Sequence, residues 1–182
     1  MIEAAAPAGS SAIRWQLMQR VIVLGPGAAG KSTFARALGH QTAIPVVELD
    51  SLFWSSALEP TPPDLWIRRQ EELCASPQWI LDGDLGPYDI LDVRLRRADT
   101  VVLFDLRTWR CVWRALRRGR ERADFWRWLL TWRRRYRSVL LDRIATFAPQ
   151  ATLVVIHGPR DVKALLRRAP GGNSAVPKSA CP

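Results

Sequence analysis

A phosphate-binding loop is the clearest chemical signal in this sequence. Residues 25–32 match the pattern G-x-x-x-x-G-K-[ST], with a β-branched run before them and a helical pattern after them. Glycines in the loop allow the backbone to curl, so that successive N–H groups point at one anion. The lysine can reach the β- and γ-phosphates of a nucleotide, and the serine hydroxyl can bind Mg²⁺. The motif therefore predicts ATP and Mg²⁺ as cofactors, bound by Gly25, Pro26, Gly27, Ala28, Ala29, Gly30, Lys31, Ser32 and Thr33.

Aspartates follow three expected strands and offer carboxylates to the same site. Asp50, Asp82 and Asp105 each end a run of apolar, mostly β-branched residues. In an open parallel sheet, the carboxyl ends of the strands line the ligand crevice. We therefore expect Asp82 to bind Mg²⁺ together with Ser32, and Asp50 to act as a base or orienting group for an acceptor hydroxyl. For any one of these aspartates, the alternative of a turn or helix cap stays open.

A sheet must position these residues, and the sequence predicts one with five strands. Short apolar runs at residues 21–24, 46–49, 79–81, 100–104 and 152–156 indicate buried strands. Helical patterns separate them at residues 31–38, 63–74, 90–97, 108–118, 122–147 and 160–168. This alternation predicts an α/β fold with a five-stranded parallel sheet flanked by helices. The domain would cover residues 20–168, between a flexible leader at 1–19 and a disordered tail at 169–182.

The basic charge of the chain is concentrated in one segment. Residues 107–137 contain twelve arginines and two acidic residues, so they carry the entire formal net charge of +10. This segment follows the fourth strand, where an arginine-rich lid could bind transferred phosphate and exclude water. Nucleic acid is the rival partner, because five of the nine tryptophans lie there too. An anionic membrane surface is not expected, since the apolar stripe of the segment is needed under the sheet.

That apolar stripe runs along the long helical pattern at residues 122–147. Its members recur at three- and four-residue steps: Phe125, Trp128, Leu129, Trp132, Tyr136, Val139, Leu140, Ile144 and Phe147. Such a stripe predicts burial, so we expect most of the tryptophans to be core residues rather than stacking platforms.

Composition excludes several classes of protein. Hydrophobic residues make up 48% and charged residues 24%, which excludes a disordered or collagen-like chain. The three cysteines form neither a disulfide framework nor a metal pattern. The longest uncharged run, residues 144–159, is too short and too polar to span a bilayer, and the first eleven residues do not resemble a secretory signal. These features predict a soluble cytoplasmic protein.

The sequence resembles adenylate kinases and their P-loop kinase relatives in three places. These are the phosphate loop, the step Asp82-Gly83, and a Phe-Asp pair at 104–105 followed by arginines nine and thirteen residues later. The resemblance implies a P-loop nucleoside triphosphate hydrolase or kinase fold. It also implies that Asp82 holds the water shell of Mg²⁺ and that Arg114 and Arg118 contact the nucleotide and its phosphates.

A closer resemblance covers nearly all of residues 20–168 and is to the adenylate kinase-related group known as DNA topology modulation proteins. It is carried by residues 49–54 (Leu-Asp-Ser-Leu-Phe-Trp), 79–83 (Trp-Ile-Leu-Asp-Gly), 98–100 (Ala-Asp-Thr) and 107–114 (Arg-Thr-Trp-Arg-Cys-Val-Trp-Arg). Where that group typically has Asp-Gly-Asn-Tyr, this chain continues the Asp-Gly step with Asp84 and Leu85. The difference falls in the expected acceptor pocket.

Together these patterns predict a Mg-ATP-dependent kinase that transfers the γ-phosphoryl group to a small acceptor, either a nucleotide or a hydroxyl compound. Arg94 is a candidate ligand for an acceptor phosphate. The alternative is an ATP-binding protein that modulates DNA topology and binds the polyanion through its Arg- and Trp-rich segment. The expected catalytic residues are Lys31, Asp50, Arg114, Arg118, Arg133 and Arg137.

Overall fold

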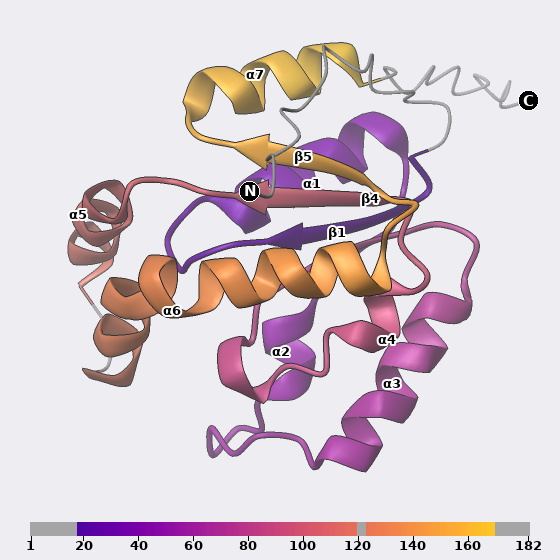
Figure 1. Ribbon diagram of the computed structural model, residues 1–182, viewed down its shortest axis with the longest axis horizontal. Helices are drawn as coiled ribbons and strands as arrows, with labels where there is room; N and C mark the ends of the chain where they lie inside the picture. The colour runs from indigo at the N-terminus through magenta and orange to yellow at the C-terminus, as the bar shows by residue number, and fades with distance from the viewer. Residues whose placement is uncertain (1–17, 120–122, 170–182) are drawn as a thin grey trace, which may run out of the picture.

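Five parallel strands form a single sheet at the centre of the molecule (Figure 1). The computed structural model describes residues 18–119 and 123–169, with the backbone alone at positions 87, 118, 123 and 124. The sheet order is β2-β3-β1-β4-β5. The strands are β1 (Arg20–Leu24), β2 (Val46–Glu48), β3 (Trp79–Asp82), β4 (Thr100–Phe104) and β5 (Thr152–Ile156). The expected α/β fold is confirmed, while the leader at 1–17 and the tail at 170–182 lie outside the described residues.

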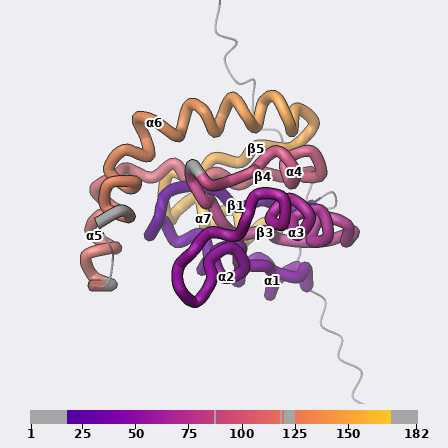
Figure 2. Tube along the Cα trace, turned by 90° about the horizontal axis from the view of Figure 1, so that it is seen from below, coloured from indigo at the N-terminus to yellow at the C-terminus, as the bar shows by residue number. Residues whose placement is uncertain are grey.

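Helices cover both faces of this sheet (Figure 2). Their bounds are α1 (Lys31–Thr42), α2 (Leu49–Phe53), α3 (Pro63–Ala75), α4 (Asp92–Leu95), α5 (Thr108–Arg118), α6 (Ala123–Phe147) and α7 (Pro159–Arg168), with a 3₁₀ helix η2 at Gly86–Tyr88. Helix α2 and η2 were not expected, and the helix predicted at 90–97 shortens to α4. None of the helices in the described parts of the chain is long and apolar enough to cross a membrane.

The central strand divides the core into two clusters by the alternation of its side chains. Val21 and Val23 pack in a cluster with residues of α1 and α7. Ile22 and Leu24 point the other way, into a cluster with residues of α3, α4 and α6. Because both faces of β1 are covered, its sequence is apolar at every inward position, as in other buried parallel strands.

Parallel pairing brings the carboxyl ends of the strands to one edge of the sheet. Val23 of β1 is in register with Asp82 of β3, and Glu48 of β2 is in register with the same Asp82. The loop that begins at Gly25 therefore leaves the sheet beside Asp82. On the other side of β1, Leu24 pairs with Leu103, so Asp105 follows close to this edge.

The second strand ends earlier than the sequence predicted. It stops at Glu48, and Asp50 lies in the first turn of α2 rather than at a strand end. The Ser51 hydroxyl donates a hydrogen bond to the Glu48 carbonyl at 2.7 Å, which turns the chain out of the strand. The Asp50 carboxylate is stabilised in this position, since negative charge is favourable near the N-terminus of a helix.

Burial of the aromatic residues differs in part from the expectation. Trp66, Trp79 and Trp132 are fully buried, but Trp109 and Trp113 of α5 are exposed. Val139 of the α6 stripe is also exposed, by 53%, because the stripe is wider than the contact of α6 with the core. The burial predicted for the stripe is therefore confirmed at its centre and wrong for Val139, while the two tryptophans of α5 lie outside the core.

Candidate functional site

The loop between β1 and α1 has a tight backbone conformation that depends on two of its glycines. Gly25 has a φ of 134° and Gly30 a φ of 93°, and both values lie in the region that favours glycine. A Cβ at Gly25 would lie 2.6 Å from the Phe104 carbonyl oxygen, so β4 leaves no room for a side chain there. Helix α1 begins directly after Gly30, with no side-chain cap and no acidic residue in its first turn. The N–H groups and positive end of α1 are thus available to an anion.

Lys31 lies across the inside of this loop. Its Nζ atom donates a hydrogen bond to the Pro26 carbonyl oxygen at 3.0 Å, and the residue is half-buried. An ammonium group held over the loop can move to a phosphate oxygen without any rearrangement of the backbone. The residues expected to bind the nucleotide, 25–33, thus form the loop and the first turn of α1.

A buried carboxylate stands beside the loop at the end of β3. Asp82 is only 3% exposed, and its Oδ1 atom has no hydrogen-bond partner among the described residues. Desolvation raises the pKa of Asp82, while the nearby Ser32 hydroxyl and the charge of Lys31 lower it in part. A buried carboxylate oxygen without a partner is unfavourable, and a bound cation would relieve it. Ser32 and Asp82, expected as metal ligands, are therefore close together.

Two further aspartates lie within the electrostatic reach of Lys31. The Lys31 charge lowers the pKa of both Asp50 and Asp84, whereas desolvation raises it and is the larger effect for each. Asp50 is an exposed residue whose carboxyl is nevertheless partly desolvated. Asp84 is held from two sides, by the Gly86 N–H at 3.1 Å and by Trp132 Nε1 at 3.2 Å. Asp84 was expected only as a difference from related proteins, and its position two residues after Asp82 was the available signal for a role at the site.

The first arginine of the expected lid reaches the loop itself. Arg114 of α5 donates a hydrogen bond from Nη1 to the Ala29 carbonyl oxygen at 2.8 Å. The same Nη1 would lie 3.4 Å from a Cβ built on Gly30. Its guanidinium is thus at the mouth of the loop, where phosphate oxygens would lie. The side chain of Arg118, predicted to act beside it, is outside the described residues.

The arginines expected from α6 gather on the carboxylate that follows β4. Arg137 Nε donates to Asp105 Oδ2 at 2.8 Å, and Arg133 Nε lies 3.5 Å from Oδ1. The Asp105 side chain is almost fully buried, while both arginines are more than a third exposed. Asp105 thereby holds α6 against the edge of the sheet and keeps two guanidinium groups near the site.

Arg94 does not face the site, contrary to the expectation that it binds an acceptor phosphate. It is fully buried and makes hydrogen bonds to Asp89 at 2.6 and 2.5 Å, to Gln70 at 2.8 Å and to the Gly83 carbonyl at 3.1 Å. These hydrogen bonds hold the guanidinium inside the protein, where it does not face a ligand. Arg94 is therefore a structural residue that fastens the segment after β3 to α3.

Aromatic residues at the start of α6 cover the loop. A Cβ on Gly27 would lie 2.3 Å from Phe125 Cε2 and 2.9 Å from Trp128 Cζ3. The Trp128 Nε1 donor is buried and has no partner among the described residues. The sequence predicted both residues as core, and their contact with the phosphate loop could not be read from helical spacing alone. They shield one side of the loop from water.

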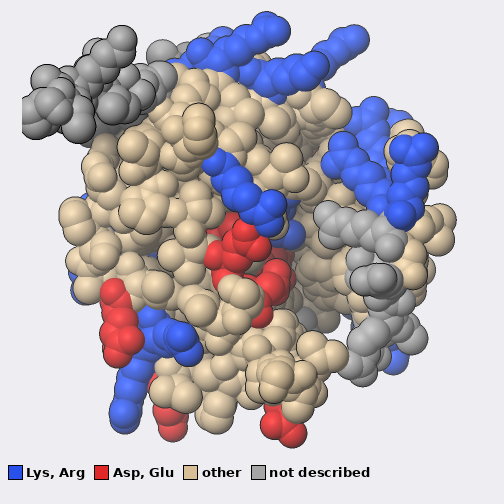
Figure 3. Space-filling view, turned by 180° about the vertical axis from the view of Figure 1, so that it is seen from behind, with Lys and Arg blue, Asp and Glu red and all other residues tan. Residues whose placement is uncertain are grey.

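Charge on the face behind the view of Figure 1 is arranged in zones. Figure 3 shows acidic side chains gathered near the centre of that face and basic side chains along its upper rim and on the side where α5 lies. Among the described residues, no group of three or more His, Cys, Asp or Glu side chains converges to hold a metal ion. Mg²⁺ bound through nucleotide phosphates needs fewer protein ligands than that, commonly one or two.

Comparisons with known proteins give a fold and no closer assignment. No protein-family model matches the chain, and no curated protein matches it in sequence. Among solved structures, a gluconokinase from Sinorhizobium meliloti 1021 is similar with a TM-score of 0.53 and 18% identity, covering 84% of this chain and 89% of that one. A shikimate kinase from Acinetobacter baumannii in complex with shikimate has a TM-score of 0.53 and 16% identity, covering 85% and 92%.

A shikimate kinase from Bacteroides thetaiotaomicron gives a TM-score of 0.52 at 13% identity, covering 82% of this chain and 95% of that one. The chain thus has the fold of P-loop small-molecule kinases. The resemblance to DNA topology modulation proteins receives no support from these comparisons.

Proposed function

We propose that this chain is a Mg-ATP-dependent kinase that transfers the γ-phosphoryl group to a small acceptor. The observation that carries the proposal is the orphaned oxygen of Asp82, buried beside Ser32 and the phosphate loop. A loop that only turned the chain would need no unpaired carboxylate at this position. A nucleotide with its metal ion accounts for the loop, the lysine and the carboxylate together.

The residues present fit ATP and Mg²⁺. The loop N–H groups and the start of α1 would hold the phosphates, and Lys31 would exchange the Pro26 carbonyl for a phosphate oxygen. Ser32 and Asp82 would hold the metal ion directly or through its water molecules. When bound, Mg²⁺ neutralises charge on the phosphate oxygens and fixes the orientation of the triphosphate. The other tasks belong to side chains of the chain itself.

Arginines would stabilise the charge of the transferred group. Arg114 already contacts the loop at Ala29, and Arg118 follows one helical turn later. Arg133 and Arg137 are close by on Asp105 and exposed enough to turn toward a phosphoryl group. Guanidinium groups aimed at developing negative charge are an effective form of transition-state stabilisation. Residues 107–137 would therefore act as a lid, as the charge pattern predicted.

The acceptor side of the site favours a hydroxyl compound. Arg94, the cation proposed for an acceptor phosphate, is occupied by Asp89 and Gln70. Carboxyl groups of Asp50 and Asp84 are present instead, and such groups accept hydrogen bonds from hydroxyls. Of the two acceptor classes that the sequence left open, a nucleotide and a hydroxyl compound, we therefore favour the hydroxyl compound.

Asp50 would handle the proton of that hydroxyl. Desolvation raises its pKa, which makes a carboxylate a better proton acceptor than it is in water. The acceptor oxygen forms a bond to the γ-phosphorus, the bond from that phosphorus to the bridging oxygen breaks, and ADP leaves. The hydroxyl proton passes to Asp50, which releases it to solvent after the product departs.

Substitution of Lys31 tests the proposal. Lys31→Ala should weaken ATP binding by at least about tenfold, because one charge-assisted hydrogen bond is lost, and should abolish ADP formation. The matched control is Lys163→Ala, which removes an exposed lysine from α7. ADP release would be measured over nucleoside monophosphates, nucleosides and small alcohols. Equal ATP affinity and turnover in the Lys31 and Lys163 variants would refute the proposal.

The alternative function, that of an ATP-binding protein that interacts with DNA and modulates its topology, has less structural support. Arg114, Arg133 and Arg137 gather at the phosphate loop and on Asp105, where a bound nucleotide would account for them without a nucleic acid partner. A titration with duplex DNA tests it directly. Tight binding that falls steeply with salt would favour the alternative over the kinase.

A further inference from the structure

The outer side of α5 carries an apolar ridge that the fold does not use. Trp109, Trp113 and Leu116 are exposed by 60%, 53% and 62%, and we call these three residues the α5 ridge. Their spacing of four and then three residues puts them on one face of the helix. Cys111 and Ala115 are buried on another face and attach the helix to the core. The α5 ridge is therefore exposed to solvent on a helix whose opposite side packs against the core.

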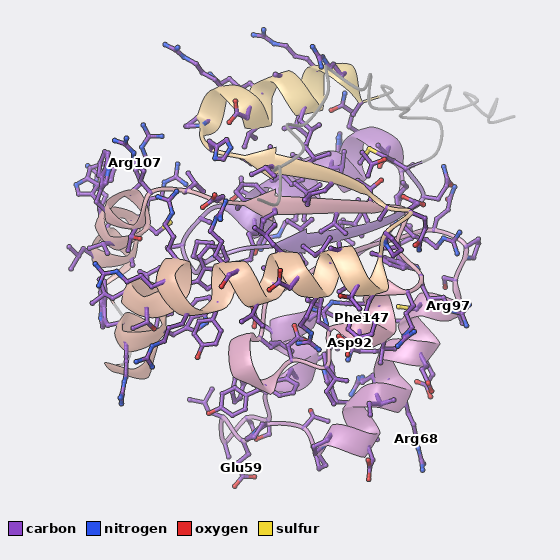
Figure 4. All side chains as sticks on the ribbon, in the orientation of Figure 1. Glu59, Arg68, Asp92, Arg97, Arg107 and Phe147 are labelled. Atoms are coloured by element: carbon purple, nitrogen blue, oxygen red, sulfur yellow. The ribbon has the colours of Figure 1, made fainter. Side chains whose placement is uncertain are left out.

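Arginines accompany the ridge along its length. The Arg117 guanidinium lies 3.9 Å from the centre of the Trp113 ring, and that of Arg110 lies 5.4 Å from the centre of the Trp109 ring. Arg107 comes just before the helix and points away from the sheet (Figure 4). Helix α5 contains no acidic residue at all. The surface thus combines exposed indoles with arginines that form no ion pair with any acidic side chain among the described residues.

The position of α5 makes this surface accessible to a broad partner. Figures 1 and 2 both show α5 at one end of the sheet, beside the start of α6. The ridge is the outward side of a helix, and a convex shape of this kind meets a flat surface more easily than it holds a small molecule. Exposed apolar clusters rimmed by charge commonly mark interaction sites.

We propose that the α5 ridge binds the surface of an anionic phospholipid membrane. Tryptophan and leucine would enter the boundary between headgroups and acyl chains, and the arginines would contact lipid phosphates. This places every member of the surface in a favourable environment, the aliphatic Leu116 included. It requires no membrane-spanning helix, because the chain would lie on the bilayer.

Other occupants match the surface less well. A second copy of the chain would bring its own basic helix against this one, and like charges would repel. A single-stranded nucleic acid would stack on indole faces, but guanidinium groups lie over both rings and Leu116 offers no stacking surface. The expectation that no membrane is bound rested on the stripe of α6, which is indeed largely covered; the ridge of α5 is a separate face.

Membrane binding would leave the proposed catalytic contacts in place. Arg114 points from α5 to the Ala29 carbonyl, away from the ridge residues in the helical repeat. The proposal stands independently of the kinase function. A catalytically inactive Lys31→Ala protein should therefore bind membranes as the unmodified chain does.

Co-sedimentation of the full chain with vesicles tests the proposal. One set contains phosphatidylcholine alone, and the other contains about a third phosphatidylglycerol. We expect binding to the anionic set, at least about tenfold weaker binding to the neutral set, and a marked decrease on addition of salt. The variant Trp109→Ser/Trp113→Ser/Leu116→Ser should lose at least about tenfold in affinity. Its control is Leu65→Ser, which removes a similarly exposed leucine from α3.

A second pair of variants separates local from overall charge. Arg110→Gln/Arg117→Gln should weaken binding roughly 25-fold, as expected for two basic residues close to an anionic surface. Arg68→Gln/Arg69→Gln removes the same charge from α3, and Figure 4 shows Arg68 directed outward on that helix. This control should have a much smaller effect, because distant charges are screened.

Three results would overturn the proposal. The first is equal binding of neutral and anionic vesicles, or binding that the ridge variant does not change. The second is ridge-dependent capture of an oligonucleotide without capture of vesicles, which would assign the surface to nucleic acid. The third is a concentration-dependent dimer that the ridge variant dissociates, again without vesicle binding. Unchanged urea midpoints of the variants would show that each result reflects the surface rather than unfolding.

Discussion

Replacement of Arg94 by leucine should destabilise the protein strongly while leaving the phosphate loop intact. Arg94 is fully buried and its guanidinium makes two hydrogen bonds to Asp89, one to Gln70 and one to the Gly83 carbonyl. Leucine would leave the buried carboxylate of Asp89 without its counter-charge. None of the residues that form the loop contacts Arg94, so the effect should be on stability and not on nucleotide affinity.

The magnitude follows from the unpaired charge. Removing one partner of a buried ion pair typically costs about 3–5 kcal/mol. Since domains are commonly stable by only about 5–15 kcal/mol, this loss is a large part of the total. For a chain of this size, each kcal/mol lowers the melting temperature by roughly 2–4 °C, so the midpoint should fall by roughly 6–20 °C. Removing both partners, in Arg94→Leu/Asp89→Leu, should recover much of the loss because no isolated charge remains.

Urea unfolding followed by circular dichroism measures these differences. The control is Arg68→Leu, an exposed arginine of α3, which should change the free energy of unfolding by about 0.5 kcal/mol or less. A loss below about 1 kcal/mol for Arg94→Leu would refute the structural role. If the double variant folds well but its affinity for a phosphorylated acceptor falls, the original expectation of an acceptor-binding arginine would be restored.

Three other expectations follow from the burial of single groups. Burial raises the pKa of Asp82, so the folded state holds its proton more tightly than the unfolded state, and this carboxyl lowers stability as pH rises from about 4 through that raised pKa. Asp82→Asn should therefore raise the melting temperature of the nucleotide-free protein in a thermal-shift assay. The same variant should lose the extra stability that Mg-ATP gives. Gly25→Ala should cost roughly 1–3 kcal/mol in urea unfolding, since its Cβ would lie 2.6 Å from the Phe104 carbonyl at a φ of 134°. Burial raises the pKa of Cys74 to about 11, so peptide mass spectrometry should find it unlabelled by iodoacetamide at neutral pH until urea unfolds the chain.

Most of the sheet could be predicted because its signals are local. Each strand is a short apolar run whose ends coincide with polar or turn-forming residues, and the observed bounds differ from the predicted ones by one residue at most. The phosphate loop is equally local, since its glycines, lysine and serine are consecutive in the chain. Asp50 lies in α2 instead of at a strand end, and this difference depends on a hydrogen bond from the neighbouring Ser51 hydroxyl that competes with continued strand pairing.

The roles of single charged residues could not be predicted in the same way. Arg94 and Arg137 are similar in sequence context, since each lies in a helical pattern and was expected at the site. One is buried on Asp89 and the other is partly exposed on Asp105, because different segments of the chain supply the partners. Such pairings depend on which elements meet in space, and no short pattern encodes them.

The excess of arginine is therefore divided between two directions. Arg114 reaches inward from α5 to the phosphate loop, whereas Arg110 and Arg117 of the same helix lie over exposed indole rings. These three arginines recur at steps of four and three residues and so form one row along the helix, and the direction that each side chain takes from this row decides what it contacts. The net charge of +10 alone could not distinguish a lid from a binding surface, whereas the contacts of α5 separate an arginine at the phosphate loop from two arginines at exposed indoles.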